Sequence, residues 1–242
     1  MKQILNITIL GLGAAMALCL PAHAAPKADG RPDGGTLNYS EYGRPATLDP
    51  ITSNESISLR ITELVFNGLV GIDEKQEIVP ELAERWEASK DGRVFTFTLR
   101  KDVKWHPREG EAPRPFTAAD VVFTYNIMTH PKTITPLKVR YEFIEKIEKT
   151  GDYTVVCTLK RPVLNALAKF SFKIIPRHGP ANSQYLTRED PFTRSPIGTG
   201  PYMIKTVTGD GEVVLVPNAD YFKGRAHIDK FIAKPFADQN IM

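Results

Sequence analysis

The sequence predicts a mixed α/β fold, because segments with the two-residue period of strands alternate with segments at helical spacing. The clearest strand is 95–99, where large apolar side chains alternate with threonines, and Val103 and Trp105 keep the same inward parity. The clearest helix begins after Thr117, whose hydroxyl can cap it with Asp120 as the reciprocal partner. With 242 residues, 42% of them hydrophobic, the chain can bury a sizeable core in one or two domains.

The first elements are expected to be a strand over 36–40, a loop over 41–50 and a helix over 56–67 with one buried face. Gly68 stands where the C-cap of that helix would be. A further helix is expected from Pro80, since proline is well tolerated at a first helical position.

Leu82 and Trp86 would share one face of the helix that starts at Pro80, because they lie four residues apart. Asp91 and Gly92 then turn the chain into the 95–99 strand. Residues 106–115 form a polar loop, and the stripe buried by the helix after Thr117 is expected to contain Val121, Tyr125 and Met128.

The second half of the chain predicts strands joined by short pieces. The expected elements are an amphipathic piece around Phe143 and Ile147, a strand over 153–159, a short helix over 161–167, a buried connection over 170–175, a hairpin of 202–207 with 212–216, and a strand over 228–233. Cys157 alternates with apolar neighbours on its strand, so it is expected to pack as a small apolar residue.

Residues 1–24 predict a secretory signal peptide. Lys2 gives a positive start, 4–20 is mostly apolar, and small residues at 22–24 allow cleavage after Ala24. A membrane anchor is the alternative, but the apolar stretch is short and interrupted by polar residues. Residues 25–35, rich in Pro, Gly and Asp, predict a flexible tether.

Charge and motifs argue against several classes of function. The net charge is +3, with both signs interspersed, which gives no support for nucleic-acid binding. The chain has no Gly-x-Ser-x-Gly, His-Glu-x-x-His or Cys-x-x-Cys motif, so we expect no enzyme, and a secreted hydrolase would lack a readable nucleophile and base. The histidines at 106, 130, 178 and 227 lack the spacing of metal ligands and are expected to be ordinary surface or loop residues, so we expect no metal and no cofactor.

Several motifs in order carry a specific resemblance. They are PELAERWEASKDGRVFTFTLRKDVKWH and FTAADVVFTYN in the centre, GGTLNYSEYGRPATLDP near the start, and SPIGTGPY and PNADYFKG near the end. Together they resemble the family 5 extracellular solute-binding proteins, the peptide- and nickel-binding receptors of ABC importers. The resemblance covers essentially the whole chain after residue 33.

This resemblance implies the two-lobed fold called periplasmic binding protein-like II. Residues 36–66 and 173–242 would form the core of the first lobe, with 67–172 inserted as a subdomain. The second lobe would be missing, because proteins of this family are longer, so we expect a truncated product or a partial sequence.

The resemblance also implies a function. The protein would capture peptides, or a related small solute, in the periplasm by closing two lobes, and would deliver them to the permease of an ABC importer as a monomer without a cofactor. Two alternatives remain open: a chaperone-like binder of extended chains, and a non-functional truncated fragment. The residues that grip a ligand's charged ends would lie largely in the missing lobe, so the ligand's identity stays open.

The resemblance places the candidate ligand-binding residues in the segment after the TLDP motif, namely Thr52, Ser53, Asn54, Glu55 and Ser56. Their backbone N–H groups could favour an anionic end of a ligand, while helix capping is the alternative for Asn54 and Ser56. Thr199 and Gly200 are a second candidate, for which a purely structural turn competes. Tyr42 and Arg44 are weaker candidates for the rim of the cleft, whereas Trp86 and Trp105 are expected to pack in the core.

Overall fold

The computed structural model describes residues 33–181 and 183–236. The predicted signal peptide, its cleavage site and most of the predicted tether lie outside the described residues. Gly34 and Gly35, at the end of that tether, exchange backbone hydrogen bonds with His227 and Lys230. Within the described part of the chain, no helix is long and apolar enough to cross a membrane.

Within these described residues, the fold contains two four-stranded sheets and a short hairpin. The strands are β1 (Thr36–Tyr42), β2 (Val70–Ile72), β3 (Ile78–Pro80), β4 (Ala83–Ala88), β5 (Val94–Leu99), β6 (Ile144–Gly151), β7 (Thr154–Leu159), β8 (Tyr202–Val207), β9 (Val213–Pro217) and β10 (Lys230–Phe236). The helices are α1 (Ser56–Val65), α2 (Ala118–Thr129) and α3 (Leu137–Arg140), with short 3₁₀ turns at Leu167–Ser171 and Pro191–Thr193.

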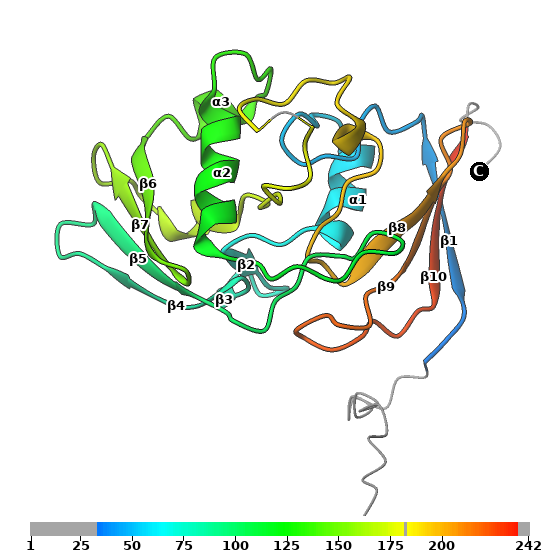
Figure 1. Ribbon diagram of the computed structural model, residues 1–242, viewed down its shortest axis with the longest axis horizontal. Helices are drawn as coiled ribbons and strands as arrows, with labels where there is room; N and C mark the ends of the chain where they lie inside the picture. Colours follow the sequence, from blue (N-terminus) through cyan, green and yellow to red (C-terminus); the bar gives the residue numbers. More distant parts are fainter. Residues whose placement is uncertain (1–32, 182, 237–242) are drawn as a thin grey trace, which may run out of the picture.

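The first sheet has the order β1-β10-β9-β8, in which only the β1–β10 pair is parallel. The second sheet has the order β4-β5-β7-β6 and is antiparallel throughout. In Figure 1 the two sheets lie at opposite ends of the molecule with α1 and α2 between them. Helix α1 contacts β8 of the first sheet, and α2 contacts β6 and β7 of the second.

The two sheets take their strands from different parts of the chain. Strands of the first sheet come only from residues 36–42 and 202–236, and strands of the second come only from residues 83–159. A division into 36–66 with 173–242 and an inserted 67–172 is compatible with this pattern and stays a prediction.

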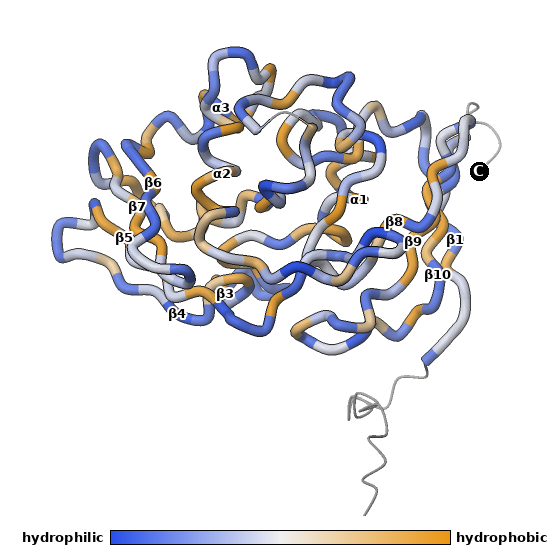
Figure 2. The backbone as a smooth tube through the Cα atoms, viewed as in Figure 1, coloured by the Kyte–Doolittle hydropathy of each residue, from blue (hydrophilic) through white to orange (hydrophobic). Residues whose placement is uncertain are grey.

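The two clearest sequence predictions are confirmed. In β5, Phe95, Phe97 and Leu99 are buried while the residues between them are partly exposed. At the start of α2, the carboxylate of Asp120 accepts the backbone N–H of Thr117 at 2.9 Å, which closes the expected cap. Figure 2 shows the matching arrangement, with apolar stretches on the inner strands and helices and hydrophilic stretches on the peripheral turns.

The predicted helix from Pro80 is wrong. Pro80 ends β3, and the following residues form β4, in which Trp86 lies opposite Phe97 of β5. The four-residue spacing of Leu82 and Trp86 suits the two-residue period of a strand as well as a helical turn. Pairing with the aromatic strand β5 decides in favour of the strand.

Several other boundaries also differ from the predictions. Helix α1 ends at Val65, so Gly68 is not its C-cap; a Cβ at Gly68 would lie only 2.7 Å from the carbonyl oxygen of Ser171. The piece around Phe143 and Ile147 is not a separate amphipathic segment: Ile147 lies in strand β6, and Phe143 is in the turn just before that strand. The short helix expected over 161–167 is a 3₁₀ turn that begins only at Leu167, and Leu164 is 86% exposed.

The second half otherwise follows the predictions. The hairpin of β8 and β9, the strand β7 and the final strand β10 all form. Cys157 is fully buried in β7, so its packing as a small apolar residue is confirmed. In α2, Val121 and Met128 are fully buried, whereas Tyr125 is half-buried and donates its hydroxyl hydrogen to the carbonyl oxygen of Ile144.

Candidate ligand-binding site

The loop that carries the TLDP motif is held together by the buried carboxylate of Asp49. One oxygen, Oδ1, accepts the backbone N–H groups of Ile51 and Thr52 at 2.9 and 2.8 Å. The other oxygen, Oδ2, accepts the hydroxyls of Thr47 and Thr52. Four donors converge on one carboxylate, so the path of the chain into α1 is fixed before any ligand is present.

Glu55 braces the same loop from the other side. Its carboxylate accepts the N–H of Ala46 at 2.9 Å, the N–H of Asn54 at 3.3 Å and the hydroxyl of Ser58. Burial alone would raise the pKa of Glu55, but these hydrogen bonds outweigh burial, so its pKa lies below the usual range. Glu55 is therefore ionised and engaged within the protein.

The five candidate residues 52–56 divide by exposure. Thr52 and Ser53 are buried, whereas Asn54 and Ser56 are exposed. The hydroxyl of Ser53 is buried without a hydrogen-bond partner among the described residues. Helix α1 starts at Ser56 without a side-chain cap, so the capping alternative for Asn54 and Ser56 is not what the structure shows.

Thr199 and Gly200 lie in a tightly packed loop. The Thr199 hydroxyl donates to the side-chain oxygen of Asn67 at 3.1 Å, and the Gly200 N–H donates to the carbonyl oxygen of Val65 at 2.8 Å. The carbonyl oxygen of Gly200 accepts from His106 and Asn218. The hydrogen-bonding groups of this loop are thus used within the chain.

The two main candidates lie at opposite ends of α1. Residues 52–56 lead into its first turn, whereas Gly200 is bonded to Val65, its last residue. A ten-residue helix is about 15 Å long, so the structure does not bring these two segments together. The position of α1 between the sheets can be followed in Figure 1.

Arg44 lies beside the TLDP loop, whereas Tyr42 is an exposed side chain at the end of β1. Arg44 lines a cavity of about 340 Å³ together with Thr47, Leu48 and residues of the β8–β9 turn. Its guanidinium donates to the carbonyl oxygen of Gly209 at 3.4 Å. Tyr42 is 58% exposed, and its ring meets Phe236 edge-on at the end of the first sheet.

His106 was expected to be an ordinary surface or loop residue; it does lie in a loop, but it is buried and not at the surface. It is 3% exposed; its Nδ1 accepts the N–H of Gly198, and its Nε2 donates to the carbonyl oxygen of Gly200. Burial lowers the pKa of His106 to about 4, an effect that the hydrogen bond to Gly200 offsets only in part. No spacing in the sequence indicates the contact of His106 with Gly198 and Gly200. By contrast, the turn in which Asp49 accepts the N–H of Ile51 could have been recognised from the Asp-Pro step in the sequence.

The described residues contain no cluster that could serve as a metal centre. No group of three or more His, Cys, Asp and Glu side chains comes together within 33–181 and 183–236.

Comparison with known proteins gives the family. Residues 77–242 match the model of bacterial extracellular solute-binding proteins, family 5. This chain belongs to that family. Its members are receptors and not enzymes, which agrees with the lack of catalytic motifs in the sequence.

Two relatives known from sequence are informative. The chain is 30% identical to the oligopeptide-binding protein AppA of Bacillus subtilis over 245 residues, which covers 99% of this chain and 44% of AppA. It is 32% identical to di/tripeptide-binding protein 2 of Pseudomonas aeruginosa over 182 residues, covering 68% of this chain and 34% of the relative. The chain thus spans less than half the length of these relatives.

Solved structures support the same family. AppA from Bacillus subtilis in complex with a nonapeptide superposes with a TM-score of 0.78 at 29% identity, over 86% of this chain and 41% of AppA. NikZ from Campylobacter jejuni in complex with Ni(L-His) superposes with a TM-score of 0.75, also at 29% identity, over 85% and 40%. The fold is therefore the mixed α/β fold of two-lobed binding proteins, and the described residues correspond to part of it.

Proposed function

We propose that this chain belongs to the substrate-binding component of an ABC importer that captures peptides in the periplasm and delivers them to the membrane permease. Residues 36–66 with 173–242 form the core of one lobe in this proposal, and 67–172 form a subdomain inserted into it. A signal peptide cleaved after Ala24 exports the protein, which acts as a monomer.

The observation that carries the proposal is the pre-formed segment at the start of α1. Asp49 and Glu55 hold its backbone from both sides, while Asn54 and Ser56 remain exposed and no side chain caps the helix. An uncapped helix start offers N–H groups to an anion, and an extended segment next to it can bond to a peptide backbone. Relatives whose names refer to oligopeptides and di/tripeptides support a peptide as the ligand.

Tyr42 and Arg44 are assigned to the rim of the site, with Arg44 beside the TLDP loop. Thr52 and Ser53 support the segment on its buried side, and the hydroxyl of Ser53, which has no hydrogen-bond partner among the described residues, is a further contact for a ligand or a water molecule. Thr199 and Gly200 contribute as the support at the far end of α1, since their polar groups are engaged there.

The first experiment identifies the ligand. The protein is purified from the periplasm without denaturation, acidified, and the released small molecules are measured by mass spectrometry. Release of peptides supports the proposal. Release of a different solute, or saturable binding of a non-peptide only, contradicts the peptide assignment, and non-saturable binding to unfolded chains favours the chaperone-like alternative.

A substitution tests the role of the helix start. Ser56→Pro removes one backbone N–H at the first helical position, where proline is tolerated and where the extended backbone of Glu55 suits a following proline. We expect S56P to leave the urea midpoint near that of the wild type and to weaken peptide binding about tenfold, as for one lost charge-assisted hydrogen bond. Ser56→Ala, the matched control, keeps the N–H and should bind as the wild type does; equal affinity of S56P and S56A would contradict the proposed contact.

A further inference from the structure

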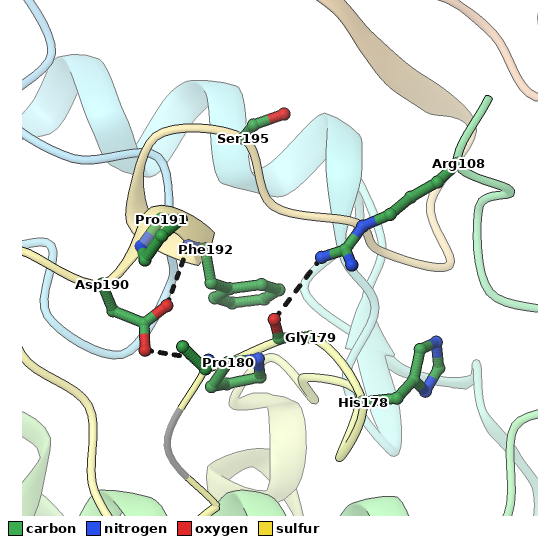
Figure 3. A pocket seen from close by; sticks show the side chains of 9 residues that line it. Arg108, His178, Gly179, Pro180, Asp190, Pro191, Phe192 and Ser195 are labelled. Carbon is green, nitrogen blue, oxygen red and sulfur yellow. Dashed lines mark hydrogen bonds between the residues drawn. The ribbon is translucent and has the colours of Figure 1, made fainter.

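A second site, separate from the start of α1, is centred on Arg108. Two cavities of about 490 and 540 Å³ share two lining residues, Arg108 and Ser195. Figure 3 shows the first cavity, with Arg108 and His178 on one side, Asp190 and Pro191 on the other, and the Phe192 ring between them. Both volumes are in the range of pockets that hold small ligands.

The guanidinium of Arg108 has no ionic partner among the described residues. Its one hydrogen bond goes to the carbonyl oxygen of Gly179, at 3.4 Å, as Figure 3 shows. By contrast, the nearby Arg114 pairs with Glu111 at 3.6 Å. An arginine fork left free at the boundary of two cavities matches a carboxylate, which it can bind through two parallel hydrogen bonds.

The charges around Arg108 are also informative. Lys205 lines the second cavity and makes no ion pair within the described chain, while Glu109 on the same wall does not pair with Arg108. In the first cavity the carboxylate of Asp190 accepts hydrogen bonds from the backbone N–H groups of Ala181 and Phe192. Arg108 and Lys205 therefore line the cavities as cations without an ionic partner among the described residues, and the carboxylate of a ligand can supply that partner.

The second cavity has an apolar wall beside its charged rim. Ile197, Met203, Ile204 and Val216 line it, three of them from the strands β8 and β9. Burial of a ligand's apolar atoms on this wall removes them from water and so favours binding. The combination of a charged rim and an apolar wall suits a ligand with one anionic end and an apolar body.

We propose that the Arg108 site binds a small amphipathic carboxylate, with its carboxylate on the guanidinium and its tail along Ile197, Met203 and Val216. This site lies near the C-terminal end of α1, because the adjacent His106 bonds to Gly198 and Gly200, which pack on Val65. The inference goes beyond peptide capture at residues 52–56, which lie at the other end of the helix.

The test uses sodium octanoate as the probe and isothermal titration calorimetry as the measurement. Octanoate should bind saturably, and Arg108→Gln should weaken its binding about tenfold or more through loss of a charge-assisted pair. Arg85→Gln is the matched control, because Arg85 is also exposed and lies on β4. It should change octanoate binding less than twofold, in line with the small effects of exposed charges.

Trp105 supplies a readout of location. Its ring centroid lies 6.2 Å from that of His178, which lines the first cavity. In a Trp86→Phe background Trp105 is the sole tryptophan, since the sequence has two. Its fluorescence should respond to octanoate in the Arg108-containing protein and should not respond, at the same concentration, after Arg108→Gln.

Three results would overturn the proposal. Equal affinity of R108Q and the wild type for octanoate would show that the guanidinium of Arg108 does not bind the carboxylate. Equal binding of octanamide, which lacks the charge, would show that the pocket does not select an anion. Inorganic phosphate binding as tightly as octanoate would show that the apolar wall plays no part.

Discussion

His106 Nε2 donates a hydrogen bond to the carbonyl oxygen of Gly200 at 2.9 Å, while Nδ1 of the same ring accepts the N–H of Gly198 at 3.1 Å. The neutral imidazole with its proton on Nε2 is the only form that makes both bonds, since a protonated ring has no acceptor. His106 follows β5 of the second sheet in sequence, and the two glycines come just before β8 of the first sheet, so one neutral side chain joins the two regions.

Protonation of His106 should make the protein less stable in acid. Its pKa is about 4 in the folded protein and about 6.5 when unfolded, so between these values the unfolded state binds more protons. The contribution of neutral His106 to the free energy of unfolding is complete above pH 6.5 and falls as the pH is lowered. By pH 5, protonation of the unfolded state has removed about 2 kcal/mol of that free energy. Urea unfolding at pH 7.5 and pH 5 in the wild type and in His106→Gln checks this.

The variant comparison isolates this histidine, because carboxylates and the other histidines titrate in both proteins. H106Q should lose less stability between the two pH values than the wild type does. If both proteins lose the same amount, His106 is not the group that titrates.

Cys157 should be unreactive in the folded protein. Burial raises the pKa of its thiol, so the reactive thiolate is scarce, and the side chain is inaccessible in β7. A thiol reagent should label it at a negligible rate under native conditions and completely in guanidinium. Rapid labelling of native protein would mean that β7 opens locally or is less buried than the structure shows.

Much of the fold could be predicted from the sequence, because local patterns and final packing agree there. Phe95, Phe97 and Leu99 alternate cleanly, and Thr117 with Asp120 forms its cap within four residues. The helix expected from Pro80 failed because a partner strand, distant from the local pattern, decided the conformation of Ala83–Ala88.

The candidate site could be predicted only in part. The resemblance to known receptors singles out the segment 52–56 as a candidate, and its role stays a prediction. The carboxylates that hold this segment act through contacts with Thr47, Ala46 and Ser58, which no sequence pattern indicates. The separation of Gly200 from that segment follows from the length and direction of α1, which only the structure gives.

Gly198→Ala should be strongly destabilising. A Cβ at this position would lie 1.9 Å from the carbonyl oxygen of Val65, so the loop or the end of α1 must move, at a cost on the order of 3 kcal/mol. Gly209→Ala is the matched control, since its Cβ would meet nothing within 4 Å, and its effect should be within about 1 kcal/mol. Urea midpoints of the two variants measure the difference; similar midpoints would show that the loop yields easily.

Asp49→Asn should weaken both the fold and peptide binding. The carboxylate accepts four hydrogen bonds, two from backbone N–H groups and two from threonine hydroxyls. An amide places two N–H donors where one oxygen accepted, so buried donors face one another and about 2–3 kcal/mol of stability is lost.

Asp73→Asn is the control, because Asp73 also accepts two backbone N–H groups but lies in an exposed turn, where water replaces a lost bond. D49N should bind peptide more weakly than D73N even at temperatures where both remain folded, since residues 52–56 would no longer be held in place. Unchanged peptide affinity in folded D49N would show that the ligand does not use the segment that Asp49 positions.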